Sequence, residues 1–198
     1  MTKQDAKAKE ALNMRDMDVH AADCYRAFLD GDDNAFVEII RAYQSGLLLY
    51  LHRFVSNLTA AEDLTEDTFV KLVTKKPRFS GRSSFKTWLY AIGRNTAVDH
   101  LRRTSRETSL PEDMTDEELS LERSYLQEER KQRLYTALRQ LKPEYGQILW
   151  LVYFEDFSMA EAAKVMKKSL HATEMLATRA RKALKEELTR EGFTYEGL

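Results

Sequence analysis

The chain has 198 residues, of which 43% are hydrophobic and 32% charged, and its net charge is −1 at pH 7. This length suits one domain of ordinary size or two small ones, with enough apolar residues for a core. No apolar run reaches the roughly 20 residues that span a bilayer, residues 1–10 resemble no signal peptide, and the single cysteine, Cys24, excludes an internal disulfide. We therefore expect a cytoplasmic protein without membrane insertion.

The charges are segregated along the chain. Residues 75–106 contain nine bases and one acid, whereas residues 107–122 contain seven acids and no base. Such a distribution suggests separate surfaces for different partners. The chain has only 7 glycines and 3 prolines, which favours helices over strands.

Four helices are expected in the first half. Residues 1–22 form a polar extension, for which a frayed or loose helix is predicted. Apolar residues recur at helical spacing from Cys24 to Val55, with a break at residues 30–33, so two helices are predicted there. A third helix is expected over about residues 60–73, and a fourth runs from a cap at Ser83 or Ser84 to about residue 103.

Residues 104–122 lose this periodicity and contain Pro111, which predicts a linker. In the second domain, Pro143 suits the first position of a helix, and Ser158 with Glu161 forms a capping box. A short helix to Met166 and a long helix from about Leu170 complete the chain. The predicted fold is all-α, with two small helical domains at 23–104 and 123–198 joined by an acidic flexible linker at 105–122.

The last two helices fit a helix–turn–helix. The second of them places four side chains on one face, at spacings of four, three and four residues: His171, Met175, Thr178 and Lys182. The first turns of such a helix can reach base edges in the DNA major groove, and neighbouring arginine and lysine side chains can hold phosphates. A plain helical hairpin with a solvated basic end fits the periodicity equally well.

Residues 78–103 combine aromatic and basic side chains. Stacking on aromatic rings together with phosphate neutralisation is how proteins hold single-stranded nucleic acid. For each aromatic residue a place in the core is the alternative, although Phe79 lies in a polar loop, where function is favoured. Upstream, four carboxylates share one face of the third helix, where they either meet a basic partner or form a solvated face: Glu62, Asp63, Glu66 and Asp67.

Three segments closely resemble region 2 of the extracytoplasmic-function (ECF) class of bacterial RNA polymerase sigma factors: AEDLTEDTF at 61–69, FKTWLYAIGRN at 85–95 and DHLRR at 99–103. Region 4 of the same class is resembled by residues 138–141 with Pro143-Glu144-Tyr145, by the Phe157-Ser158 turn, by Glu161-Ala162-Ala163 and by RARKAL at 179–184. The likeness covers roughly residues 24–188 in the same order.

The resemblance implies two partners, core RNA polymerase and promoter DNA, and an anti-sigma factor is a possible third. It implies that the third helix docks on the clamp helices of core polymerase and that the acidic linker threads toward the active-site channel. The residues that it assigns to core binding are Glu62, Asp63, Glu66, Asp67 and Phe69. Those that it assigns to capturing the melted −10 element are Arg78, Phe79, Arg82, Lys86, Trp88, Tyr90, Arg94, Asn95, Arg102 and Arg103. Those that it assigns to the −35 element are Ser169, His171, Ala172, Glu174, Met175, Thr178, Arg179, Arg181 and Lys182.

The recognition helix departs from the usual pattern of the class. Glu174 stands in place of a base, Leu176 is apolar, and the turn before the helix has lysines instead of the customary glycine. The −35 contacts therefore stay open, and the extension at residues 1–22 has no assigned role.

Two other functional classes are alternatives to a sigma factor. A stand-alone helix–turn–helix regulator would bind its operator tightly without polymerase, whereas a sigma factor binds free promoter DNA weakly and needs core polymerase. An enzyme is disfavoured because the four histidines are scattered and no catalytic set, phosphate loop or metal-ligand spacing appears. No catalytic residue, metal or cofactor is expected.

Overall fold

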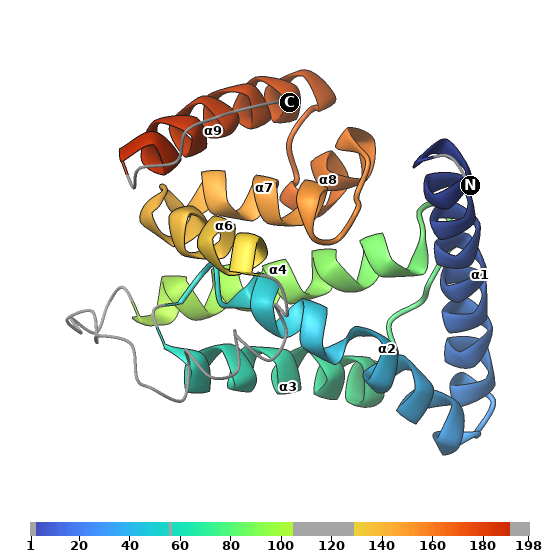
Figure 1. The fold of residues 1–198 in the computed structure, drawn as a ribbon. Coiled ribbons are helices and arrows are strands. Elements are labelled where there is room, and N and C mark those ends of the chain that lie inside the picture. Colours follow the sequence, from blue (N-terminus) through green and yellow to red (C-terminus); the bar gives the residue numbers. More distant parts are fainter. Residues whose placement is uncertain (1–2, 56, 105–128, 191–198) are drawn as a thin grey trace.

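The computed structural model describes residues 3–55, 57–104 and 129–190. Within these ranges all regular structure is helical, as the sequence predicts, and Figure 1 shows the helices stacked in layers, with α1 standing along one side. The predicted linker at 105–122 lies outside the described residues. The helices are α1 (Lys3–Leu29), α2 (Asp33–Leu51), α3 (Leu58–Lys75), α4 (Phe85–Thr104), α6 (Glu129–Gln140), α7 (Pro143–Tyr153), α8 (Met159–Met166) and α9 (Leu170–Arg190).

The break between α1 and α2 has a clear local cause. Gly31 has a φ of +110°, a backbone conformation that residues with a side chain rarely adopt. Asp32 then caps α2, because its side chain accepts hydrogen bonds from the backbone N–H groups of Asn34 and Ala35 at 3.0 and 3.4 Å. The sequence places this break correctly. It does not predict the extent of α1, which runs as one helix through residue 22, where the extension was expected to end.

The first four helices enclose a core rich in aromatic rings. Tyr25 of α1, Tyr43 of α2 and Phe85 of α4 meet here, with ring centroids of Tyr25 and Tyr43 lying 5.7 and 6.0 Å from that of Phe85. Leu64, Thr68 and Leu72 of α3 are also buried. The core positions α4 between α1, α2 and α3.

The second set of helices follows the predicted caps and turns. Pro143 begins α7, and Ser158 with Glu161 forms the capping box of α8. Lys167 takes the turn into α9 in the left-handed conformation, at φ 54°, where the class usually has glycine. The fold therefore tolerates this departure, at the modest cost expected of a lysine in that conformation.

Candidate nucleic-acid and protein interfaces

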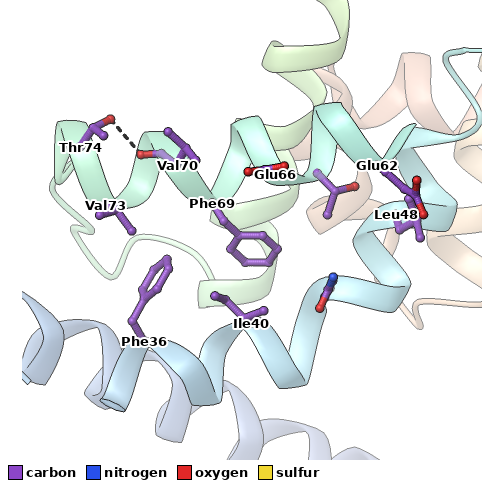
Figure 2. Close-up of a pocket in the computed structure, with 11 residues that line it drawn as sticks. Phe36, Ile40, Leu48, Glu62, Glu66, Phe69, Val70, Val73 and Thr74 are labelled. Carbon is purple, nitrogen blue, oxygen red and sulfur yellow. Dashed lines mark hydrogen bonds between the residues drawn. The ribbon is translucent and has the colours of Figure 1, made fainter. Parts of the chain in front are cut away.

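An apolar groove with an acidic rim lies between α2 and α3. Figure 2 shows Phe36 and Ile40 of α2 facing Phe69 of α3 across it. Glu62 and Glu66 also line the groove, whose volume is about 630 Å³. The predicted core-binding residues thus divide into two groups. Glu62, Glu66 and Phe69 line one groove, whereas Asp63 and Asp67 are exposed on α3 and do not line it.

The valines of this groove are unusually exposed for apolar side chains. Val70 and Val73 of α3 have exposed fractions of 45% and 41%. Burying apolar surface stabilises a complex by about 25 cal/mol per Å², so covering these valines with a partner favours binding. The groove can therefore accept an apolar helix face, and its rim favours a basic partner.

The loop before α4 and the start of that helix bring several predicted −10 residues together. Arg78 and Arg82 are exposed in the loop, and Phe79 folds back so that its ring centroid lies 5.3 Å from that of Trp88. Arg94 and Asn95 are half-buried further along α4, and Arg102 and Arg103 are exposed at its end. Four of these arginines are thus open to solvent, while Phe79 and Trp88 pack against the core.

The remaining two predicted −10 residues lie beneath the second domain. Lys86 forms an ion pair of 2.8 Å with Glu155, whose side chain is 6% exposed, and it also donates to the backbone oxygen of Glu155. Tyr90 has no exposed surface and packs on Phe157, with ring centroids 5.2 Å apart. In this arrangement Lys86 and Tyr90 face the α7–α8 turn instead of solvent.

Glu161 joins the same contact from α8. Its Oε1 accepts a hydrogen bond from the Ser84 hydroxyl at 3.3 Å, and the Thr87 hydroxyl lies at 3.5 Å. Burial alone acts to raise the pKa of Glu161, but the hydrogen bonds from Ser158, Ser84 and Thr87 hold the pKa below its usual range. The start of α4 is therefore held against α8 by an ionised carboxylate.

The face of α9 is open, in contrast to α4. All nine predicted −35 residues are exposed, in the turn before α9 or along it. Thr173, Ala177 and Ala180 pack the opposite face into the core. Leu176, which departs from the class pattern, is half-buried and packs against that core. The side chains predicted to share one face of this helix are thus exposed on one side, and their role at the −35 element stays a prediction.

Three residues with a part in these surfaces were not singled out for it from the sequence. Asp18 accepts two backbone N–H groups at the start of α4, and Glu155 and Glu161 bind α4 from the second domain. The partners of each lie 67 or more residues away along the chain, so no local pattern marks them. Only the capping role of Glu161 has a local signal, which is its spacing from Ser158.

Two family descriptions match this chain in the predicted order. Sigma-70 region 2 matches residues 39–107, and Sigma-70, region 4 matches residues 131–184. The chain is also 33% identical to the RNA polymerase sigma factor YlaC of Bacillus subtilis (strain 168), over 77% of this chain and 91% of that protein. The chain belongs to the ECF class of RNA polymerase sigma factors.

Other relatives of this ECF sigma factor carry the class name itself. It is 31% identical to the ECF RNA polymerase sigma factor SigC of Mycobacterium tuberculosis, over 78% of this chain and 83% of that protein. Its fold resembles that of CnrH in complex with the cytosolic domain of CnrY, with a TM-score of 0.62 and 24% identity over 87% of this chain and 97% of that chain. The sigma factor RpoE of Bartonella quintana, solved with the anti-sigma factor NepR, gives the same TM-score at 23% identity, over 78% of this chain and 96% of that chain.

The described residues contain neither a membrane-spanning helix nor a cluster of metal-binding side chains. None of the helices within them is long and apolar enough to cross a membrane. The same part of the chain contains no group of three or more histidine, cysteine, aspartate or glutamate side chains that could hold a metal ion.

Proposed function

We propose that this sigma factor directs core RNA polymerase to promoters through three separate surfaces, and that it does so in the cytoplasm, without catalysing a reaction and without a cofactor. The groove between α2 and α3 binds core polymerase, the loop at 76–84 with α4 captures the −10 element, and α9 reads the −35 element. The domain boundaries that go with this assignment are 23–104 and 123–198, with residues 105–122 between them.

The observation that carries the core-binding assignment is the pairing of an apolar floor with acidic rim residues. Glu62 and Glu66 both line the groove, next to the exposed valines of α3. A basic amphipathic helix matches both properties, since its apolar face covers the valines and its bases meet the carboxylates. The clamp helices that the resemblance implies are the partner that we assign to it.

The −10 assignment rests on the loop and on α4. Arg78 and Arg82 are exposed beside the half-buried rings of Phe79 and Trp88. An extruded base that stacks on such rings regains about 1–3 kcal/mol, which offsets the few kcal/mol that unstacking costs. Melting is stabilised in this way by capture of the base.

In the arrangement described above, the protein cannot bind the −10 and −35 elements at the same time. The −10 and −35 elements lie about 25 base pairs apart, which is roughly 85 Å at 3.4 Å per base pair. Here α4 contacts α8 directly, through Lys86 with Glu155 and Ser84 with Glu161. The two domains therefore separate before or during promoter binding, in keeping with a sigma factor that binds free promoter DNA weakly and needs core polymerase. An anti-sigma factor that holds the domains together would act on the same equilibrium.

The test is run-off transcription with purified core polymerase, on a template that carries the upstream region of the chain's own gene. A discrete start site is expected with the wild-type protein. The charge reversals Glu62→Lys and Glu66→Lys should weaken core binding in a pull-down. Asp30→Lys, an exposed reversal in the α1–α2 turn outside the groove, should not. Failure of the wild-type protein to bind core polymerase at all would overturn the proposed function.

A further inference from the structure

The first helix reaches both ends of the loop that we assign to the −10 element. We propose that α1 positions this loop, residues 76–84, and the first turn of α4, through Asp18 and Tyr25. The inference rests on the proposed function of the loop. It gives the N-terminal extension a role that the matched family region, which begins at residue 39, does not cover.

Asp18 completes the cap of α4. The first N–H groups of any helix lack partners within the helix. Here Ser84 Oγ accepts the N–H of Thr87 at 3.1 Å. The carboxylate of Asp18 accepts the two donors before it, Phe85 N–H at 2.9 Å and Lys86 N–H at 2.8 Å. A negative charge at this end of α4 is also favoured by the helix dipole.

Tyr25 holds the other end of the loop. Its hydroxyl donates to the backbone oxygen of Pro77 at 2.9 Å. Tyr25 lies about two helical turns from Asp18 along α1. Its ring centroid lies 5.1 Å from that of Trp88, and Phe79 packs on Trp88 in turn. Burial raises the pKa of Tyr25 to about 12, so the hydroxyl keeps its proton and remains a donor at neutral pH.

The two contacts fix the ends of the loop while its middle stays open. Arg78 and Arg82 are exposed between the anchored ends. A loop that is already ordered loses less conformational entropy when it binds, and this gain goes to affinity. Asp18 and Tyr25 are thus positioning residues, which act through the loop and do not touch DNA.

A different outcome is possible for the same geometry, and the experiment separates the two. A helix N-terminus is also a site for a phosphate group. If a DNA phosphate used the N–H groups of Phe85 and Lys86, the carboxylate of Asp18 would compete with it. Removal of Asp18 would then speed promoter opening, whereas removal of a positioning residue slows it.

The variant is Asp18→Ala, and its control is Asp16→Ala, an exposed change two residues away on the same helix. We expect opening of the duplex promoter by the holoenzyme to slow by roughly twofold to thirtyfold, the range that corresponds to loss of a helix cap. Core affinity should stay unchanged. Asp18→Asn, which keeps one acceptor oxygen, should be intermediate, and it also serves if Asp18→Ala does not fold.

A second readout does not depend on transcription. Amide hydrogen exchange at Phe85 and Lys86 should quicken in Asp18→Ala and not in Asp16→Ala. In a Trp150→Phe background the emission of Trp88 should move to longer wavelength only in Asp18→Ala. Unchanged exchange and emission, or opening at or above the wild-type rate, would overturn the proposal. If the wild-type protein opens no promoter, the proposed function fails, and the exchange data still decide whether α1 positions the loop.

Discussion

We expect the ion pair between Lys86 and Glu155 to determine how firmly the two domains hold together. The change Glu155→Gln keeps the volume and one acceptor oxygen but removes the charge. A buried hydrogen bond to a charged group contributes about 1.5–3 kcal/mol, and a neutral one about 0.5–1.5 kcal/mol. The side chains of Lys86 and Glu155 are only 20% and 6% exposed, so solvent screens the pair weakly. The amide still accepts from the charged ammonium of Lys86, so the loss is at most about 1.4 kcal/mol, which corresponds to a shift of up to tenfold toward the open form.

This shift can be measured as a change in the distance between the domains. Fluorescent labels on Thr59 of α3 and Glu186 of α9, both exposed, would report it by energy transfer in a Cys24→Ser background. Since apparent affinity scales with the fraction of competent protein, affinity for a single-stranded −10 oligonucleotide without core polymerase should rise by up to tenfold.

A substitution of the other partner, Lys86, gives a larger expected effect. Lys86→Met leaves Glu155 buried without its cation, which costs about 3–5 kcal/mol while the domains stay closed. Energy transfer should therefore fall further than in Glu155→Gln. The affinity for DNA should rise less, because this variant also lacks one positively charged side chain. Equal energy transfer in the wild-type protein and both variants would refute the reasoning, because it would mean that the pair does not hold the domains together.

Three further outcomes follow from the contacts described above. A Cβ atom at Gly46 would lie 2.7 Å from Glu155 Oε1, so Gly46→Ala should open the domains by energy transfer even though alanine favours helix α2 by about 1 kcal/mol. The contact made by Glu161 should persist above the ordinary carboxyl pKa of about 4.3 and be lost as the pH falls through the lower pKa of the folded state, whereas Glu161→Gln should lose that acid transition. Asp32→Ala removes the cap of α2 and should lower the free energy of unfolding by about 0.5–2 kcal/mol in a urea titration.

Much of the fold follows from local signals in the sequence. The glycine and aspartates at 30–33 mark the first break, Pro143 marks the start of α7, and the capping box marks the start of α8. The spacing of residues along α9 separates its exposed face from its buried one, because this helix packs on one side only. Each of these features depends on residues within one or two helical turns of one another.

The surroundings of α4 could not be predicted in the same way. This helix contacts α1, α2, α3 and α8, so its polar residues have no single solvated face. Lys86 has the sequence signature of a phosphate-binding residue, yet it pairs with Glu155, which comes 69 residues later. Asp18 lies in a polar extension without a marked pattern and bonds 67 residues away. Such contacts depend on how the helices and domains pack, which periodicity does not encode.

The two carboxylate oxygens of Glu161 make different contacts: one caps helix α8, and the other bonds to the first domain. Oε2 accepts the Ser158 backbone N–H at 3.0 Å and the Ser158 hydroxyl at 2.7 Å, while Oε1 reaches Ser84 of the other domain. When the domains part, only Oε1 loses its partner, and water can replace it. Helix α8 keeps its cap, so the helix–turn–helix is released already folded. We therefore expect opening to be a rigid-body motion, on the microsecond-to-millisecond scale of domain motions.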